Sequence, residues 1–204
     1  MMRKQTAALL LAVLLLLAVL AGCGAEAPSD PPAEDSRAAE DTGETGTAAA
    51  LGSLASFTAG TLDGGTFTQD DVAGKDVTVV NFWSLTCSPC IAEMPDLASF
   101  AGALPDNVQV ITVCLDGGGN PEAAAEVLEK AGFGGVTLIS GDGDLAALCA
   151  NLMYTPTTVF ADSAGALVGD AVIGGQSDLS GTFLAAVNRV LAAGGKDEIS
   201  LETQ

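Results

Sequence analysis

The 204-residue sequence predicts an α/β domain with a central, mixed but mostly parallel sheet that is flanked by helices. Apolar, β-branched runs at 77–83, 108–115 and 157–161 are typical of buried strands. Segments with helical composition separate these runs, and such an alternation favours a mostly parallel sheet. The roughly 150 residues after residue 52 are enough for one domain with its own hydrophobic core.

The first 22 residues have the layout of a secretory signal peptide. Arg3 and Lys4 precede an apolar run at 7–21, and small residues lead up to Cys23. A transmembrane helix is the alternative, but the run is short for a span of about 20 residues. The four residues that end at Cys23, LAGC, resemble a bacterial lipobox. We therefore expect residues 1–22 to be removed and Cys23 to be lipidated.

Residues 23–52 have the composition of a disordered, acidic tether. The segment is rich in Ala, Pro, Glu, Asp, Thr, Ser and Gly, and it has almost no large apolar residue before Leu51. Such a chain cannot bury enough apolar surface to offset the entropy lost on ordering. The alternative is that this acidic segment is a tail that recognises a specific partner. We expect the tether to carry a domain at 53–195, which a C-terminal tail at 196–204 follows.

The charge of the chain excludes several partners. The formal net charge is −19 at pH 7, and loss of Arg3 and Lys4 with the signal peptide leaves −21. A strongly acidic protein is unsuited to nucleic acid and to a polybasic contact with anionic lipid. We expect no nucleic-acid partner and no cofactor, and we expect a monomer.

The elements of the domain can be placed in order. Residues 57–68 read as a hairpin around Asp63-Gly64-Gly65, and 69–75 as a turn or short helix before the central strand. Asn120 and Pro121 are typical of a helix start, and Gly132 of a helix end. The elements expected after the central strand are a helix to about 104, a strand at 108–115, a helix from 121, a strand at 136–139, a helix at 142–151, strands at 157–161 and 166–173, and a helix at 180–191.

Two cysteines follow the central strand directly. Cys87-Ser88-Pro89-Cys90 opens a segment of helical composition, so a strand delivers two thiols to a helix N-terminus. The free N–H groups and the helix dipole there favour a thiolate and can lower a cysteine pKa from about 8.5 to roughly 3.5–7.5. We expect Cys87 to be the nucleophile and Cys90 its shielded partner, which together switch between dithiol and disulfide.

A zinc site is the alternative for this pair. Zinc needs about four nitrogen or sulfur ligands, yet the chain has no His and no second Cys-x-x-Cys. Cys114 and Cys149 can complete a four-thiolate set only without the paired spacing that such sites use. Redox chemistry is therefore the better interpretation, and we expect no metal.

Four separate motifs carry a family resemblance. They are Asn81-Phe82-Trp83, Cys87-x-x-Cys90, Glu93-Met94-Pro95 and the segment 154–160. In this order they resemble the thioredoxin fold, and in particular the membrane-anchored TlpA/ResA-like thiol-disulfide oxidoreductases, over about residues 56–191. The resemblance implies a thioredoxin-like domain with an N-terminal β-hairpin and an inserted αβ unit.

The same resemblance implies roles for individual residues. Cys87 and Cys90 would form the redox-active disulfide, and Glu93 would be an acid that moves protons beside it. Thr155-Pro156 would be a cis-proline segment that faces the cysteines and binds substrate backbone, and Trp83 would help to bind substrate. An exposed helix glutamate and an ordinary trans proline are the alternatives for Glu93 and Pro156.

The chain departs from the family pattern beside the cysteines. Thr86 stands where many members have a second Trp, and Ser88-Pro89 replaces the usual Pro-Pro or Gly-Pro. Residues between the cysteines tune the redox potential, so the resemblance does not fix the direction of electron flow.

Two further cysteines remain, Cys114 and Cys149. In an exported protein such an even pair can form a second disulfide. One alternative is that both are buried, inert thiols. The other is a redox role, in which Cys114 and Cys149 receive electrons from Cys87 and Cys90.

We therefore expect an extracytoplasmic, lipid-anchored oxidoreductase on the outer face of a bacterial plasma membrane. It would reduce disulfides of exported proteins and be reset by a membrane or extracytoplasmic electron donor. A peroxiredoxin-like thiol peroxidase and a non-catalytic binding lipoprotein are the rival functions. A peroxiredoxin is disfavoured because the residues before Cys87 do not form the Pro-x-x-x-Thr/Ser-x-x-Cys pattern of that class. A non-catalytic protein is disfavoured because both cysteines of the Cys-x-x-Cys motif are intact.

Overall fold

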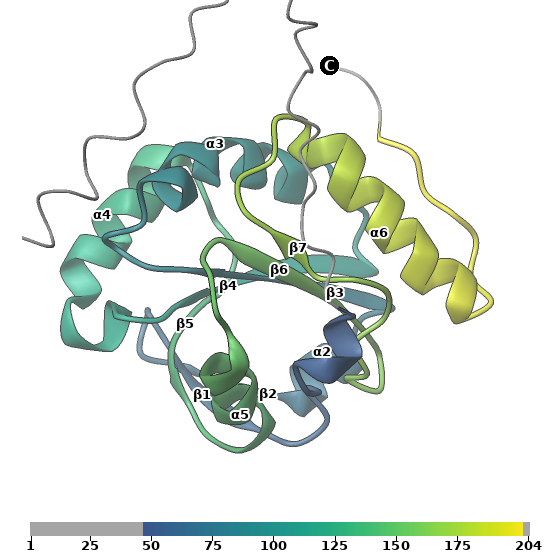
Figure 1. Cartoon of the computed structure of the whole chain (residues 1–204), viewed down its shortest axis with the longest axis horizontal. Coiled ribbons are helices and arrows are strands. Elements are labelled where there is room, and N and C mark those ends of the chain that lie inside the picture. Colours follow the sequence, from purple (N-terminus) through teal and green to yellow (C-terminus); the bar gives the residue numbers. More distant parts are fainter. Residues whose placement is uncertain (1–46, 202–204) are drawn as a thin grey trace, which may run out of the picture. The chain divides into compact units, whose positions relative to one another are not determined.

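The protein is built on a seven-stranded sheet with helices on both faces (Figure 1). The structure is a computed structural model that describes residues 47–201. In chain order, the elements are β1 (Thr58–Thr61), β2 (Thr66–Thr68), α2 (Gln69–Ala73), β3 (Val77–Trp83), α3 (Ser88–Ala103), β4 (Val108–Cys114), α4 (Pro121–Ala131), β5 (Thr137–Gly141), α5 (Gly143–Asn151), β6 (Thr157–Asp162), β7 (Val172–Ile173) and α6 (Leu179–Ala193). Short 3₁₀ helices lie at Ala48–Ala50 and Gly117–Gly119.

The sheet is mixed, with the strand order β2-β1-β5-β4-β3-β6-β7. Strands β3, β4 and β5 pair in parallel, whereas the outer pairings through β1, β2, β6 and β7 are antiparallel. The predicted mixed α/β class is confirmed, although parallel pairing is confined to the centre. Helices connect the central strands, while a tight hairpin joins β1 to β2 and permits antiparallel pairing.

Strand β3 fixes where the functional groups can meet. It is buried along its whole length between β4, which runs parallel to it, and β6, which runs antiparallel. Trp83 at its end pairs with Cys114 at the end of β4, and Phe82 pairs with Thr157 at the start of β6. The ends of β3 and β4 and the beginning of β6 therefore share one edge of the sheet.

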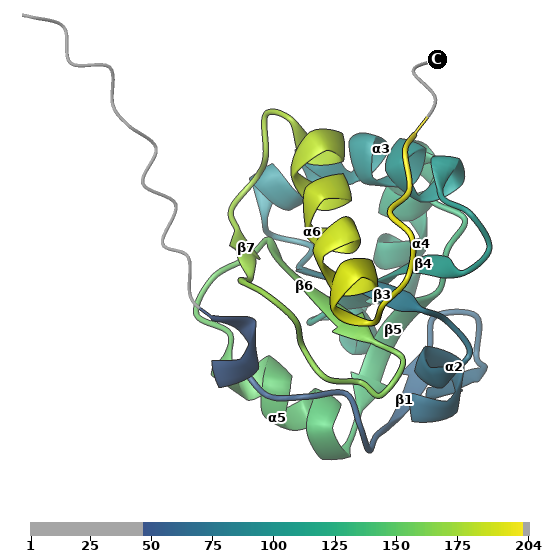
Figure 2. The same ribbon diagram turned by 90° about the vertical axis from the view of Figure 1, so that its right-hand side faces the viewer.

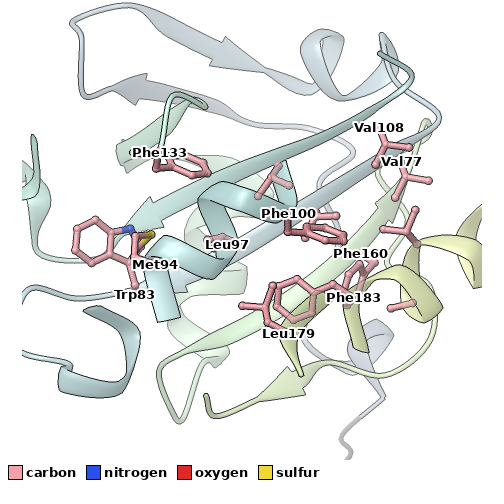
Figure 3. Close-up of a cluster of buried hydrophobic side chains, with 14 of the residues drawn as sticks. Val77, Trp83, Met94, Leu97, Phe100, Val108, Phe133, Phe160, Leu179 and Phe183 are labelled. Atoms are coloured by element: carbon pink, nitrogen blue, oxygen red, sulfur yellow. The ribbon is translucent and has the colours of Figure 1, made fainter. Parts of the chain in front are cut away.

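Two apolar clusters form, one on each face of the sheet. Helices α3, α4 and α6 cover one face, and α2 and α5 lie on the other (Figures 1 and 2). Side chains alternate along β3, so Val77 and Val79 join the first cluster and Val80 and Phe82 the second. Figure 3 shows the first cluster, in which the ring of Phe183 packs edge-to-face on two other rings.

The predicted N-terminal hairpin is present as β1 and β2. Thr61 N donates to Gly65 O at 3.1 Å across the turn, and Gly64 has a φ of 87°. This backbone conformation is open to glycine without strain. Thr68 then caps α2 through a capping box with Asp71.

The folded region begins earlier than the sequence predicted. Residues 47–52 were assigned to the tether, but Ala48 is fully buried and its N–H donates to Gly169 O at 3.1 Å. Thr47 also forms a bridge with Asp170. Ala48 belongs to the second cluster and Leu51 packs against it, a contact that a tether-like composition does not predict.

The last part of the chain also deviates from expectation. The predicted strand at 166–173 is reduced to the two residues of β7, because Gly169, with a φ of 80°, breaks the run after isolated bridges at Ala166 and Leu167. After α6 the chain turns back along that helix (Figure 2), and Asn188 makes two hydrogen bonds of 2.9 Å with the backbone of Ile199.

Several predictions fall outside the described residues. The signal peptide, Cys23 and the tether up to residue 46 lie there, as do residues 202–204. Within 47–201, no helix is long and apolar enough to cross a membrane.

Candidate active site

Cys87 and Cys90 form a disulfide at the start of α3, with a Cα–Cα distance of 5.3 Å. Cys87 is the N-cap residue, and its Sγ accepts a hydrogen bond from Cys90 N at 3.3 Å. Pro89 lies in the first turn, where a missing N–H leaves no helical hydrogen bond unmade. Cys87 is partly exposed and Cys90 is fully buried. The pair thus has an accessible sulfur and a shielded one.

The turn before the cysteines is held at both ends. Cys87 N donates to Ser84 O at 3.1 Å, and Trp83 O accepts from Leu115 N at 2.9 Å. Between these two bonds, Leu85 N donates to the carboxylate of Asp116, at 2.9 Å to Oδ1 and 3.2 Å to Oδ2. Sequence reasoning did not find Asp116, which lies in the glycine-rich turn after β4.

Glu93 lies one helical turn after Cys90 and is almost completely buried. Its Oε1 accepts a hydrogen bond from Asn81 Nδ2 at 3.2 Å. Burial raises the pKa of Glu93, and the Asn81 contact lowers it by a smaller amount. The alternative of an exposed helix glutamate is wrong. Cys90 and Glu93 share a face of α3, since residues three apart in a helix are neighbours.

Asn81 belongs to the Asn81-Phe82-Trp83 motif, and its side chain organises the buried polar groups. Its amide donates to Glu93 and also to Thr158 Oγ1 at 2.9 Å. Asn81 pairs with Thr158 in the β3–β6 register, so the amide joins β3, α3 and β6. The available signal was a polar residue inside an apolar buried strand, since buried polar groups need hydrogen-bond partners.

Two oxygens of this network, Glu93 Oε2 and Asn81 Oδ1, are buried without a hydrogen-bond partner among the described residues. An ionised carboxylate would leave a charged oxygen here without a donor, which is costly. Burial therefore disfavours the carboxylate relative to that of an exposed acid, which raises the pKa of Glu93 and makes its carboxylate a stronger base.

The Thr155–Pro156 peptide bond is cis. Pro156 is buried and its carbonyl accepts from Gly174 N at 2.8 Å, while Thr155 is partly exposed. The next residue, Thr157, pairs with Phe82 near the end of β3. The cis peptide thus lies at the sheet edge that also carries the disulfide.

Trp83 does not have the predicted substrate-facing position. Its side chain is 0 % exposed and belongs to the cluster between the sheet and α3, with Met94 and Leu97 (Figure 3). Side-chain alternation along β3 places Trp83 on the same face as Val79 and Asn81, pointing into the core. Trp83 is corrected to a core residue beneath the site.

The second disulfide is also corrected, because Cys114 and Cys149 are both free. Cys114 packs in the cluster on the α3 face and Cys149 against the cluster on the other, so the sheet separates them. Burial and the adjacent Asp116 carboxylate raise the pKa of Cys114 to about 12. Its thiol donates to Asp116 Oδ1 at 3.5 Å, and such a thiol is a poor nucleophile.

Exposed apolar side chains gather in the segments around the disulfide. Four of the five large ones in the described residues are Ile91, Leu115, Met153 and Tyr154. Ile91 follows Cys90, Leu115 follows β4, and the other two precede the cis peptide. The strand register brings these segments to one sheet edge.

Solved structures with the same fold include several redox proteins. DsbF of Mycobacterium tuberculosis is 27 % identical with a TM-score of 0.52, and the match covers 68 % of this chain and 96 % of that one. A secreted disulfide oxidoreductase of M. tuberculosis, homologous to Escherichia coli DsbE, is 26 % identical with a TM-score of 0.52 and coverages of 68 % and 97 %. A thiol:disulfide interchange protein from Bacteroides sp. is 25 % identical with a TM-score of 0.54 and coverages of 67 % and 90 %.

These likenesses confirm the predicted thioredoxin-like fold. No curated protein matches the chain. Residues 52–169, more than half of the chain, match the AhpC/TSA family. The chain therefore belongs to the AhpC/TSA family.

Proposed function

We propose that this protein is a thiol-disulfide oxidoreductase that works outside the cytoplasm and reduces disulfides of exported proteins. The observation that carries the proposal is the Cys87–Cys90 disulfide, with one accessible and one buried sulfur at a helix N-terminus. The similar structures support it, since their names describe disulfide oxidoreductases and a thiol:disulfide interchange protein.

The first step starts from the dithiol. The 16-residue helix α3 directs its free N–H groups at Cys87, which stabilises the thiolate. This thiolate attacks one sulfur of a substrate disulfide. A mixed disulfide forms between Cys87 and the substrate, the substrate S–S bond breaks, and the second substrate sulfur leaves as a thiolate that takes a proton from solvent.

In the second step, Cys90 releases the product. Its thiol gives a proton to the Glu93 carboxylate, and the resulting thiolate attacks Cys87 Sγ. The Cys87–Cys90 bond forms, the mixed disulfide breaks, and the substrate leaves as a dithiol with two electrons from the enzyme. A raised pKa suits Glu93 to this step, because it brings the acid closer to the thiol that it deprotonates. An external dithiol donor then reduces the enzyme disulfide.

The surroundings of the disulfide suit a polypeptide substrate. The exposed side chains of Ile91, Leu115, Met153 and Tyr154 provide an apolar surface at that sheet edge, and exposed apolar patches mark interaction sites. Thr155, which precedes the cis proline, offers backbone groups next to this surface.

The location is proposed from the N-terminal sequence. Arg3, Lys4, the apolar run at 7–21 and Cys23 fit a lipoprotein signal, and more than one acyl chain gives stable anchoring. A Cys23→Ser variant expressed in bacteria should move from the membrane fraction to the soluble extracytoplasmic fraction. Equal membrane retention of both proteins would overturn lipid anchoring at Cys23.

The central experiment is a redox titration of the full-length protein against glutathione, together with trapping of partners. Cys90→Ser should accumulate mixed disulfides with exported proteins, because the release step is blocked, and Cys87→Ser should accumulate none. A potential near −270 mV would support a reductant, whereas one near −120 mV would indicate an oxidant. No thiol exchange at all would overturn the proposal and leave a non-catalytic binding protein.

A peroxiredoxin-like peroxidase is the second candidate, because a partly exposed Cys87 can also attack a hydroperoxide. That reaction would give a Cys87 sulfenic acid and an alcohol, and Cys90 would then close the same disulfide with release of water. Turnover of hydroperoxide by the reduced protein, without any disulfide substrate, would favour this function over protein reduction.

A further inference from the structure

Asp116 connects the turn that carries the cysteines to the neighbouring strand. Its two carboxylate oxygens accept the N–H of Leu85 at 2.9 and 3.2 Å. Leu85 lies two residues before Cys87, whereas Asp116 lies two residues after the end of β4. The contact is therefore made across the sheet edge rather than within the turn.

This contact is the side-chain anchor for the middle of the turn. Backbone bonds hold its two ends, from Leu115 N to Trp83 O and from Cys87 N to Ser84 O. The Leu85 side chain packs against the cluster beneath α3. Loss of the Asp116 carboxylate would leave the Leu85 N–H without this partner and free the segment that positions Cys87.

The carboxylate is also close enough to act on Cys87 through its charge. Two residues span at most about 7 Å, and an Asp116 oxygen lies 2.9 Å from Leu85 N. The charge is thus within about 10 Å of the Cys87 backbone, which is roughly one Debye length at 0.1 M salt. A negative charge at this distance opposes formation of a thiolate on Cys87.

We propose that Asp116 is a positioning residue that holds the active-site turn and biases the Cys87–Cys90 pair toward the disulfide. The hydrogen bond to Leu85 fixes the turn in both redox states. The charge disfavours the reduced state, in which Cys87 carries a thiolate. The inference rests on the proposed function only in requiring that the cysteine pair exchanges with thiols.

Other titratable groups lie on the elements next to the pair and must be kept constant in any test. On α3 they are Glu93 and Asp96, in β4 the thiol of Cys114, and before β6 the phenol of Tyr154. The cationic side chains of residues 47–201 belong to other segments: Lys75, Lys130, Arg189 and Lys196.

Two substitutions separate the hydrogen bond from the charge. Asp116→Asn keeps an oxygen acceptor for Leu85 and removes the charge, whereas Asp116→Ala removes both. The matched control is Asp162→Asn, because Asp162 Oδ1 also accepts backbone N–H groups, at 2.9 Å from Ala164 and Ala166. Asp162 ends β6 opposite Val77, at the other end of the sheet from the cysteines.

The test equilibrates full-length protein with glutathione. Two glutathione thiols supply two electrons and two protons to the Cys87–Cys90 disulfide, which gives the dithiol and one glutathione disulfide. Both Asp116 variants should shift this equilibrium toward the dithiol by roughly two- to tenfold, as expected for one charge at this distance. Asp162→Asn should leave it unchanged.

Hydrogen exchange and alkylation complete the test. The amides of Leu85 and Cys87 should exchange faster in Asp116→Ala and at the wild-type rate in Asp116→Asn. In chemically reduced protein, the pH profile of Cys87 alkylation should move to lower pH in both variants.

The role of Asp116 would be overturned if both Asp116 variants had the same glutathione equilibrium and the same Cys87 alkylation profile as the wild type and Asp162→Asn. If the wild type itself fails to exchange with glutathione, the proposed function fails. The alkylation profile of Cys87 would still decide the effect of Asp116 on the thiol, so the two failures are distinguishable.

Discussion

Asn81 donates a hydrogen bond to Glu93 Oε1 at 3.2 Å and couples the central strand to the helix that carries both cysteines. The same amide bonds Thr158 on β6. Three elements that meet at the disulfide are thus joined through one buried side chain. The acid at the centre of the proposed proton transfer is held by groups that are far from it in the sequence.

Replacing Glu93 by Gln should slow the release of product by Cys90. The amide keeps the shape and an acceptor for Asn81 but cannot take a proton, and general base catalysis contributes roughly 10²- to 10⁴-fold. Single-turnover decay of the mixed disulfide should slow by at least about tenfold near pH 7 and lose its inflection from Glu93. Attack by Cys87 on the substrate should be much less affected. An unchanged pH profile for the release step would remove the proton role of Glu93.

The same substitution should change how stability depends on pH. Burial raises the pKa of Glu93 in the folded state, so the folded protein binds a proton more tightly than the unfolded chain. Glu93 therefore contributes fully to the free energy of unfolding at pH values below its pKa in the unfolded chain. This contribution is lost as the pH rises through the pKa of Glu93 in the folded protein. Denaturant titrations of the oxidised protein should show this loss in the wild type. The free energy of unfolding of Glu93→Gln should depend less on pH over the same range. The same pH dependence in both proteins would contradict a buried, proton-binding Glu93.

Asn81→Ala should act through Glu93. Loss of the amide removes the donor to Oε1, so the pKa of Glu93 should rise further, and the release step should need a higher pH. The buried cavity and the lost hydrogen bonds should lower the free energy of unfolding by about 1–3 kcal/mol. The measurements are the pH profile of mixed-disulfide decay and a denaturant titration.

Thr158→Val is the matched control for Asn81. It removes the other hydrogen bond of the same amide and leaves the contact with Glu93 in place. We expect reduced stability with a pH profile close to that of the wild type. A profile that moves equally in both variants would show that Asn81 affects the release step through general loosening of the core.

The location of the cysteine pair was predictable because its signals are local. An apolar β-branched run, a polar turn and a Cys-x-x-Cys at a helix start all lie within 77–90. The Asn81–Thr158 and Leu85–Asp116 contacts join residues 77 and 31 positions apart. Such contacts follow from strand order and register, which the pattern of a single segment does not specify.

The wrong assignment of Trp83 could have been avoided with a stricter use of periodicity. Val77, Val79 and Trp83 alternate along β3, so Trp83 had to face the same helices as the two valines. Cys114 follows Val108 and Val110 on the corresponding face of β4. The position of Cys149 on the opposite face required knowledge of where α5 packs, and no local pattern supplied it.

Substitution of Met153 and Tyr154 by Ser should weaken recognition of protein substrates. Met153 is 81 % exposed and Tyr154 58 %, and both lie directly before Thr155 and the cis proline. Loss of this apolar area should lower kcat/KM for a protein disulfide by roughly tenfold, mainly through KM. The rate with glutathione disulfide should remain unchanged because glutathione is too small to need the surface.

The control for this double variant is Val136→Ser. Val136 is the other large apolar residue exposed in 47–201, and it precedes β5, which β4 and β3 separate from β6 and the cis proline. Equal loss with Val136→Ser, or equal loss with glutathione disulfide, would contradict a docking role for Met153 and Tyr154.

Cys114 should be unreactive and should not exchange electrons with the Cys87–Cys90 pair. Its buried thiol has a pKa of about 12 and is held by Asp116, so very little thiolate forms near neutral pH. Iodoacetamide should label the partly exposed Cys149 before Cys114 in the native oxidised protein, and peptide mass spectrometry separates the two. Cys114→Ala should retain wild-type disulfide exchange while it loses about 1 kcal/mol of stability from the smaller core side chain. Exchange that falls with Cys114→Ala but not with Cys149→Ala would instead show that electrons pass through Cys114, and the assignment of this thiol to the core would be wrong.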